Sequence, residues 1–307
     1  MNVFIAGGSG AIGVPLVRAL VAAGHPVTAS TRSSANASML RSLGATAAIA
    51  DALDAEALRR VVVAAHPTHV IHQLTALRKA GPRSTRDLIP TNRLRIEGTR
   101  NLLAAAVGAG ATRLVGGSFA LLGVAKPDVP AGMQEAADGV RSMESQILEA
   151  SRSGAIEGVV LRYGLFYGPE NPSTKQAIAL VRRRMLPMIR GDRGQLPFIH
   201  VDDAASATVA ALDRAPAGST YDIVDDRAVS MSEFAETLAQ TVGARRPFEI
   251  PAWLLRLLTP YVAPMVALRL PLSNQKARTE LGWQPSFPSI REGLIRTLPQ
   301  SGVSVLR

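Results

Sequence analysis

Asn2-Val-Phe-Ile-Ala-Gly-Gly-Ser-Gly-Ala-Ile-Gly13 is the stretch of the chain that decides the fold. The short apolar run Val3 to Ala6 predicts a buried strand, and the apolar-periodic stretch Ile12 to Ala23 predicts a helix. The turn between them carries glycine at three-residue intervals, at Gly7, Gly10 and Gly13. Glycine allows a tight turn, close approach of the backbone to a pyrophosphate, and close packing of helix on strand.

Because this turn joins a strand to a helix at the start of the chain, it predicts a dinucleotide site. The first backbone N–H groups of the helix are expected to face the phosphates, aided by the helix dipole. The predicted phosphate-binding residues are Gly7, Gly10, Ala11, Ile12 and Gly13.

Bulk composition excludes several classes of site. The chain has 307 residues, of which 47% are hydrophobic and few are aromatic, as in an ordinary soluble globule. It has no cysteine, which excludes disulfides, thiol nucleophiles and thiolate metal sites. The five histidines are scattered, and His69 and His72 fall on opposite faces of a predicted strand, so no metal site is expected.

The formal net charge of +10 invites a nucleic-acid interpretation, but its distribution argues against one. The arginines are spread along the chain, and Arg182 to Arg184 is the only triple run, so a solvated basic surface is favoured. The apolar segment 253–272 is interrupted by Arg256, Arg269 and three prolines, which excludes a membrane span. Since the chain begins directly with a strand, we expect a soluble, cytoplasmic protein without nucleic-acid or membrane partners.

The end of the second strand, His25 to Ser30, should select the cofactor. NAD is recognised there by a carboxylate that binds the ribose 2′-hydroxyl, yet the first fifty residues contain no Asp or Glu. The chain offers Ser30, Thr31 and Arg32 instead, which suit a 2′-phosphate. The sequence therefore favours NADP(H) over NAD(H), although Arg32 alone is equally consistent with an exposed loop.

Strands and helices alternate along the first two thirds of the chain. Further predicted strands cover 45–50, 68–73, 113–115, 158–161 and 220–224. Predicted helices cover 34–43, 92–107 and 139–152, and Asp54 caps one more. This alternation predicts an α/β fold, a Rossmann-type doubly wound parallel sheet with its ligand crevice at the carboxyl ends of the strands. We expect an NADP-binding domain from residues 1–162, joined by 198–228, and a small C-terminal substrate-binding subdomain, or cap, from 163–197 and 229–307.

These features together resemble the extended and atypical short-chain dehydrogenase/reductases, the NAD(P)-dependent epimerase/dehydratase family. The resembling segments are Gly7–Gly13, Arg95–Leu103, Val160–Pro169, Phe198–Asp203 and Leu281–Pro285. The resemblance implies a nicotinamide cofactor, a homodimer formed by helix packing, and cofactor contacts from Asp51, Leu74 and Thr75, which follow strands three and four.

The chain departs from the family at its proton relay. Members usually carry a serine after strand five, a Tyr-x-x-x-Lys pair on the next helix and an asparagine on the long helix. Ser118 matches the serine, but Ala136 and Val140 take the places of the tyrosine and lysine, and Arg95 that of the asparagine. No tyrosine lies between Ser118 and Arg162, and none of the four tyrosines is followed by lysine four residues later.

Several residues could replace the relay, each with a structural alternative. Ser118 could donate to a substrate oxygen or satisfy loop backbone groups. Tyr163 could donate a proton or be a buried tyrosine with a satisfied hydroxyl. His72 could contact the substrate or be a core histidine. Arg95 could anchor a carboxylate or phosphate of the substrate, or it could face solvent. Tyr167 is a third candidate substrate contact, for which packing is favoured. Asp202 and Asp203 are predicted to cap a helix at Ala204. Glu135 and Asp138 border the vacant tyrosine position and could act as an acid or base, although a solvated pair is favoured.

Three functions remain open at this point. The first is an NADP(H)-dependent oxidoreductase that acts on a small, largely apolar carbonyl or alcohol, with Ser118 polarising the oxygen and Tyr163 as a replacement acid. The second is an isomerase, dehydratase or cyclase that uses the nucleotide without net redox chemistry. The third is a non-catalytic sensor of NADP(H). Loss of the relay adds weight to the second and third, because general acid–base help is worth about 10²–10⁴-fold in rate. The oxidoreductase is nevertheless the function that we place first.

Overall fold

The structure is a computed structural model of the full chain. It describes residues 1–77, 82, 84–123, 131–258, 263–266, 268–270 and 272–298. Lys126, the one lysine between Ser118 and Arg162 in the sequence, and Tyr261, one of the four tyrosines, lie outside this set, as does part of the loop between residues 78 and 90.

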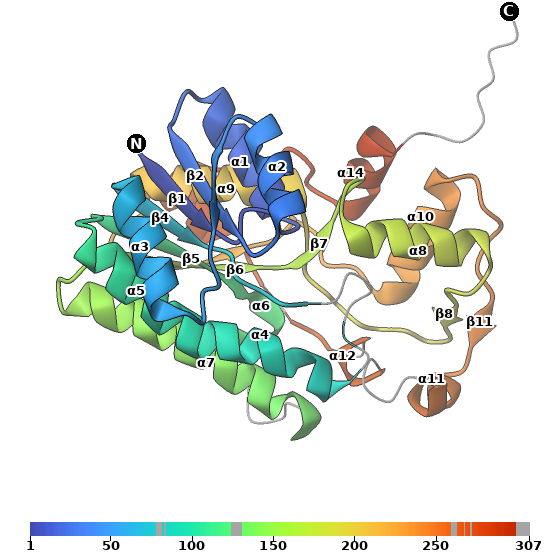
Figure 1. Ribbon diagram of the computed structural model, residues 1–307. Helices are drawn as coiled ribbons and strands as arrows, with labels where there is room; N and C mark the ends of the chain where they lie inside the picture. The colour runs from blue at the N-terminus through green and yellow to red at the C-terminus, as the bar shows by residue number, and fades with distance from the viewer. Residues whose placement is uncertain are drawn as a thin grey trace, which may run out of the picture.

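One parallel sheet of seven strands organises the molecule (Figure 1). Its strands are β1 Val3–Ala6, β2 Val27–Thr31, β3 Thr46–Ile49, β4 His69–His72, β5 Arg113–Phe119, β6 Glu157–Tyr163 and β10 Thr220–Ile223. They lie in the order β10-β6-β5-β4-β1-β2-β3, and every pairing is parallel. The order reverses between β1 and β4, which is the topological switch point of a Rossmann fold, so the predicted fold class is confirmed.

Helices cover both faces of the sheet. One face carries α1 Gly13–Ala22, α2 Ser34–Ser42 and α9 Val201–Arg214. The other carries α3 Ala55–Ala65, α4 Ile89–Arg93, η2 Leu94–Gly98, α5 Thr99–Gly108 and α7 Ala131–Arg152, with the short turns η1 Thr85–Leu88 and α6 Ala120–Gly123 nearby. This is the doubly wound arrangement that alternating strands and helices predict.

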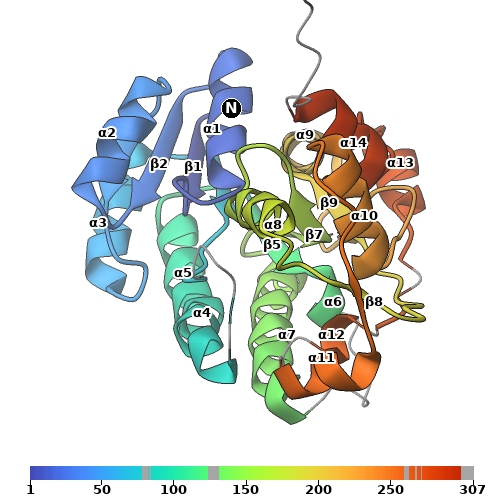
Figure 2. The same ribbon diagram turned by 90° about the vertical axis from the view of Figure 1, so that its right-hand side faces the viewer.

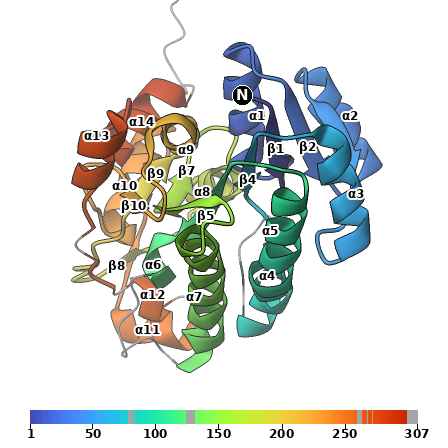
Figure 3. The same ribbon diagram turned by 90° about the vertical axis from the view of Figure 1, so that its left-hand side faces the viewer.

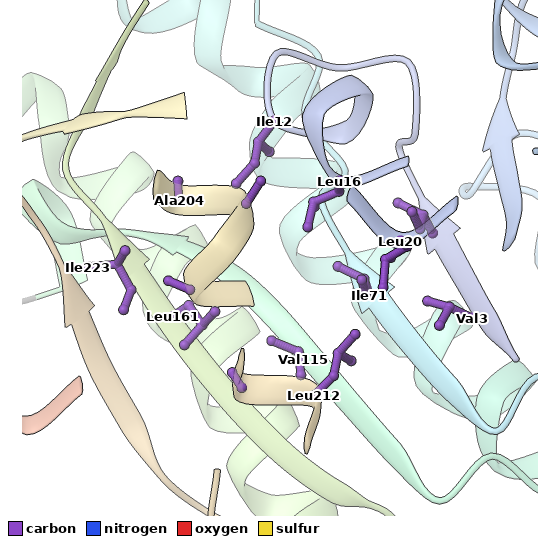
Figure 4. Packing of buried hydrophobic residues seen from close by; sticks show 14 of the residues in the cluster. Val3, Ile12, Leu16, Leu20, Ile71, Val115, Leu161, Ala204, Leu212 and Ile223 are labelled. Carbon is purple, nitrogen blue, oxygen red and sulfur yellow. The ribbon is translucent and has the colours of Figure 1, made fainter. Parts of the chain in front are cut away.

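The core of the sheet domain is apolar on both faces. Figure 4 shows Leu16 and Leu20 of α1 directed toward β1 and β4, with Val3 and Ile71 beneath them. All four side chains are fully buried. Small residues on α9, such as Ala204, let that helix approach the sheet closely, which is why an alanine-rich segment forms a core helix here.

A second, smaller lobe lies beyond the carboxyl ends of the strands (Figures 1 and 2). It contains β7 Leu165–Tyr167, α8 Pro172–Arg182, β8 Met188–Ile189, β9 Phe198–His200, α10 Met231–Thr241, β11 Glu249–Ile250, α11 Ala252–Leu258, α12 Ala263–Val266 and α14 Ile290–Thr297. The lobe has its own core, in which Phe198 and Phe234 stack with ring centroids 5.2 Å apart. Helix α13, Gln275–Leu281, packs on α9 and β10 instead (Figure 3), so this piece of the 229–307 segment lies against the sheet domain.

The long helix predicted for 92–107 is present, but it is not α-helical throughout. It runs as α4, then the π-helical turn η2, then α5. At the junction, the Thr99 hydroxyl donates to the carbonyl of Arg95 at 2.6 Å. A π turn adds a residue to the helix and changes the direction of the side chains around it. Arg95 itself lies in this turn, which turns it inward rather than to solvent.

The prediction that Asp202 and Asp203 cap a helix at Ala204 is wrong. Helix α9 begins at Val201, and its N-cap is His200, whose Nδ1 accepts from the Asp202 amide. The Asp203 carboxylate is buried and accepts from the Ser286 and Phe287 amides at 2.8 and 2.9 Å. The Asp203 carboxylate is expected from the sequence to cap its own helix, but it binds two backbone amides from a distant segment of the chain.

A second buried carboxylate follows β10. Asp225 is only 5% exposed, and neither of its carboxylate oxygens has a hydrogen-bond partner among the described residues. Burial raises its pKa to about 8, and the nearby charge of Asp203 acts in the same direction. The other titratable groups around it are Tyr167, His200 and Asp226. Asp225 is therefore held in its neutral form at moderate pH.

The buried Asp225 predicts that the folded protein loses stability as the pH rises from acidic to neutral values. Its folded pKa lies above the ordinary value of 3.8, so the folded chain holds a proton that the unfolded chain releases, and stability falls as pH rises between these values. Within that window the wild type should lose roughly 1.4 kcal/mol per pH unit relative to Asp225→Asn. Urea denaturation of both proteins from about pH 5 to about pH 8 measures this difference.

Asp213→Asn provides the control, because Asp213 lies exposed on α9. Its stability profile should run parallel to that of the wild type. If the Asp225→Asn profile were also parallel to the wild type, Asp225 would not be the group responsible.

Candidate functional site

The turn between β1 and α1 requires glycine at two points. Gly7 has φ +90°, and a Cβ on it would lie 2.5 Å from the Gln73 carbonyl oxygen. A Cβ on Gly13 would lie 2.4 Å from the Gly7 carbonyl oxygen. No side chain fits at such distances, so helix and strand approach each other as closely as the glycine spacing predicts.

The N-terminus of α1 offers unpaired donors. No side chain caps it, and no acidic residue lies in its first turn. The first amide to find a backbone acceptor is that of Val14, which donates to Gly10 at 3.2 Å. Within the described chain the amides of Ala11, Ile12 and Gly13 have no acceptor. These donors and the helix dipole suit a dinucleotide pyrophosphate.

The three polar residues at the end of β2 differ in whether their side chains already have hydrogen-bond partners. The Ser30 hydroxyl accepts from the Gly7 amide at 3.4 Å, and the Thr31 hydroxyl bonds that of Ser9 at 3.2 Å. Both side chains are buried and hold the glycine turn in place. Arg32 is exposed and has no ion-pair or hydrogen-bond partner in the described part of the chain. It is the residue of this group that remains available for a ligand.

The other expected cofactor contacts line the ends of β3 and β4. Asp51 is half-buried, and its carboxylate accepts from the Leu53 amide at 3.0 Å, which shapes the turn after β3. Leu74 is half-buried beside Gly98, and Thr75 is exposed. Their contact with a nucleotide stays a prediction.

His72 is a structural histidine. It is fully buried at the end of β4, where Nε2 donates to the Thr99 hydroxyl at 2.8 Å and Nδ1 accepts from the Leu74 amide. The tautomer follows from the Thr99 hydroxyl, whose proton is used on Arg95. Burial lowers its pKa to about 4, with a smaller contribution from the charge of Arg95. Both nitrogens are occupied, so the core-histidine alternative holds and the substrate contact does not.

Ser118 lies at the end of β5, and its hydroxyl is already a donor. It donates to Oε1 of Glu144, on α7, at 2.5 Å. Arg162, on β6, donates to the same carboxylate through Nε at 2.9 Å and Nη2 at 2.6 Å. The expectation that Ser118 donates to a substrate oxygen therefore needs correction, because its one proton is used on Glu144.

Ala136 and Val140, which stand where the family carries its tyrosine and lysine, belong to an apolar cluster. Ala136 and Val140 are 1% and 0% exposed, and they pack with Leu88, Leu122 and Ala137. Glu135 and Asp138, on the outer side of α7, are exposed, and Asp138 pairs with Arg141, so the expectation of solvated residues holds.

Arg95 lies against this apolar cluster. It is 7% exposed, and its Nη1 donates to the Ala136 carbonyl at 3.5 Å and to Oδ1 of Asn92 at 3.3 Å. The alternative that Arg95 faces solvent is therefore wrong. A guanidinium stands beside the position where the family carries its tyrosine.

Tyr163 is 2% exposed, and both hydrogen-bonding roles of its hydroxyl are filled. It accepts from Gln73 Nε2 at 3.1 Å and bonds the Thr208 hydroxyl at 2.6 Å, and Thr208 in turn donates to the Ala204 carbonyl. Burial raises the pKa of Tyr163 to about 12. The proton is directed into α9, away from the crevice, which argues against the predicted role of proton donor.

Tyr167 is also a core residue. It is fully buried, its hydroxyl donates to the Ser289 carbonyl at 3.2 Å, and its ring packs edge-on against His200 at 5.2 Å. Burial raises its pKa. The packing alternative favoured for Tyr167 agrees with this geometry, and the substrate contact does not.

Two features of the site were not anticipated from the residues alone. Gln73 crosses β5 so closely that a Cβ on Gly117 would lie 2.2 Å from its Oε1. Glu144, on α7, is the partner of Ser118. The sequence shows a glutamate eight residues after Ala136 and an arginine at position 162, but nothing in it links that glutamate to Ser118.

The described residues contain no group of three or more histidine or acidic side chains placed to bind a metal ion. None of their helices is long and apolar enough to cross a membrane.

Comparisons with known proteins place this geometry among nucleotide-binding enzymes. The family described as "NAD dependent epimerase/dehydratase family" matches residues 3–224. A 3-diazoavenalumate denitrifying reductase from a Streptomyces species is 37% identical, over 96% of this chain and all of the relative. A 4-hydroxy-2-methyl-3-oxo-4-farnesyl-3,4-dihydroquinoline-1-oxide ketoreductase from Stigmatella aurantiaca is 26% identical, over 92% of each chain. The NAD complex of Thermus thermophilus UDP-glucose 4-epimerase has the same fold, with a TM-score of 0.77, 24% identity and 97% of each chain covered.

The contacts at Gly13 predict the effect of a single methyl group. Gly13→Ala must push the helix from the turn, so we expect a loss of about 1–3 kcal/mol in stability and weaker NADPH binding. Fluorescence titration with NADPH and thermal denaturation measure the two effects. Gly108→Ala is the control, since a Cβ there meets no atom within 4 Å. Unchanged NADPH affinity in Gly13→Ala would contradict the assigned phosphate site.

Proposed function

The chain belongs to the NAD-dependent epimerase/dehydratase family, and we propose that it is an NADPH-dependent reductase of a diazonium-bearing organic carboxylate. It is an NAD(P)-binding enzyme of the short-chain dehydrogenase/reductase type, with reductases among its relatives. These relatives favour the oxidoreductase hypothesis over the non-redox and sensor hypotheses. The homodimer and the cytoplasmic location stay predictions.

The residues present fit a nicotinamide dinucleotide. Gly7 and Gly13 leave room for the backbone to approach a pyrophosphate, and the amides of Ala11, Ile12 and Gly13 are free to bind it. Arg32 supports the choice of NADPH, because an exposed guanidinium beside a strand end without acidic residues suits a 2′-phosphate. When bound, the cofactor supplies a hydride.

Among the described residues at the site, no acid has a proton available for a substrate, and this carries the choice of substrate. Reducing a ketone requires a proton as well as a hydride, yet Ala136 and Val140 replace the family's proton relay. The protons of Tyr163 and Ser118 are directed to Thr208 and Glu144. A diazonium group needs no proton: R–N₂⁺ accepts hydride, the C–N bond breaks, its electron pair leaves with N₂, and R–H forms. The name of the Streptomyces relative describes a denitrifying reduction of a diazo carboxylate, which supports the same chemistry here.

Arg95 is the proposed anchor for the carboxylate. Its Nη1 contacts the Ala136 carbonyl and Oδ1 of Asn92 at a buried position next to the apolar cluster, where a guanidinium attracts a carboxylate more strongly than in water. Arg95 then orients the substrate from one end, and the apolar cluster around Ala136 and Val140 keeps water from the reacting carbon.

The role of Arg32 predicts a change in cofactor preference. Arg32→Ala should weaken NADPH binding about tenfold or more, because it removes a charge-assisted contact to the 2′-phosphate, and should leave NADH binding nearly unchanged. Fluorescence titration with both nucleotides measures the ratio. Arg41→Ala, an exposed arginine on α2, should behave as the wild type. Equal loss for NADPH and NADH would remove Arg32 from the 2′-phosphate site.

The proposed reaction predicts a substrate preference. With NADPH, the enzyme should convert 4-carboxybenzenediazonium to benzoate and N₂, with kcat/KM at least about 10²-fold above that for 4-acetylbenzoate, because the ketone lacks the acid it requires. Deuterated NADPH should place one deuterium on the ring carbon that carried nitrogen. Product mass spectrometry against an enzyme-free control measures both.

A faster reaction with 4-acetylbenzoate would reject the diazonium proposal. It would make the enzyme a ketone reductase, as the Stigmatella relative's name describes for that protein.

A further inference from the structure

We propose that Glu144 fixes Ser118 as a hydrogen-bond acceptor toward the substrate, and that this orientation makes the site select a positively charged group. The inference rests on the proposed function, since it names the residue pair that would face the diazonium end of the substrate. In this role Glu144 is a positioning residue, because it acts through Ser118.

The direction of the hydrogen bond follows from chemistry. A carboxylate has no proton to donate, so in the 2.5 Å contact between Ser118 Oγ and Glu144 Oε1 the serine must be the donor. A hydroxyl has one proton and two acceptor lone pairs. Ser118 therefore has acceptor capacity but no proton left for a ligand.

Glu144 forms an ion pair with Arg162. Glu144 is 5% exposed, and Arg162 donates to both of its oxygens. The hydrogen bond to Glu144 raises the pKa of Arg162, so the guanidinium stays charged. Asp222 pairs in register with Arg162 on the neighbouring strand, and one of its oxygens has no hydrogen-bond partner in the described chain. The charge of Asp222 also raises the pKa of Arg162.

The surroundings strengthen the effect of this orientation. Phe119 packs against the apolar cluster of Leu122, Ala136 and Val140 near the end of β5. A serine oxygen that donates its proton to Glu144 presents its lone pairs, and so a partial negative charge, to a ligand. In low dielectric this charge attracts a cation and repels the oxygen of a ketone, which gains negative charge during reduction. To donate to a ketone, Ser118 would have to leave Oε1 of a buried carboxylate with one hydrogen bond fewer.

A pair of inert ligands isolates this preference from catalysis. 4-Trimethylammoniobenzoate and 4-tert-butylbenzoate have the same shape and both carry a carboxylate. Only the first also carries a positive charge, at the opposite end of the ring. Calorimetric titration of the full chain loaded with NADP⁺ should give the cation about tenfold tighter binding. Equal affinities, or tighter binding of the neutral ligand, would overturn the inference.

Two variants test the residues. Ser118→Ala removes the acceptor and leaves the Glu144–Arg162 pair intact, so the preference for the cation should fall to about one. Glu144→Gln can direct its amide N–H to Ser118, which frees the serine proton, so the preference should fall and binding of 4-acetylbenzoate should tighten. Glu149→Gln, on the exposed side of α7, should retain the wild-type preference.

The variants also separate this inference from a structural role. If Glu144 only stabilised the fold, Glu144→Gln would weaken all three ligands by the same factor, and that result would reject the inference. If thermal denaturation shows that Glu144→Gln is not folded, the result for Ser118→Ala decides the question alone. Because these measurements need no turnover, a wild type that prefers the cation but reduces only ketones would reject the proposed function and not the orientation of Ser118.

Discussion

The close approach of α1 to β1 is the constraint on which the structure depends. A Cβ on Gly13 would lie 2.4 Å from the Gly7 carbonyl oxygen, and one on Gly7 would lie 2.5 Å from that of Gln73. Without side chains at these points, the helix N-terminus stands directly above the switch point of the sheet, where the strand order reverses. His72, Ser118 and Tyr163 lie at the ends of β4, β5 and β6 at the same edge of the sheet.

Polar groups at that edge are used for architecture more than their residue types suggest. His72 joins β4 to α5, Tyr163 joins β6 to α9 through Thr208, and Gln73 reaches Tyr163 across β5. All three side chains are buried, and both hydrogen-bonding roles of His72 and of Tyr163 are filled, as burial in low dielectric demands. The catalytic potential of a histidine or tyrosine therefore depends on which atoms surround it, and here those atoms are structural partners.

The departure from the family's proton relay has a consistent physical form. An alanine and a valine complete an apolar cluster, a guanidinium lies beside it, and the one serine that remains is bonded to a carboxylate. This arrangement offers no proton, and it favours positive charge near Ser118 and negative charge near Arg95. A substrate that combines a cationic leaving group with a carboxylate satisfies both, which is why we favour a diazonium carboxylate over a ketone.

The sequence by itself determined the fold and the position of the nucleotide turn. Glycine spacing and apolar periodicity are local patterns, and they report backbone requirements that no other residue can meet. The sequence also identified the missing relay, because the absence of Tyr-x-x-x-Lys is visible without a structure. Only the tertiary structure decided what His72, Tyr163, Asp203 and Ser118 do, since their partners lie 26 to 90 residues away in the chain. A hydrogen bond between distant segments leaves no periodic trace, so the direction of the Ser118 proton could be found only when β5, β6 and α7 were brought together.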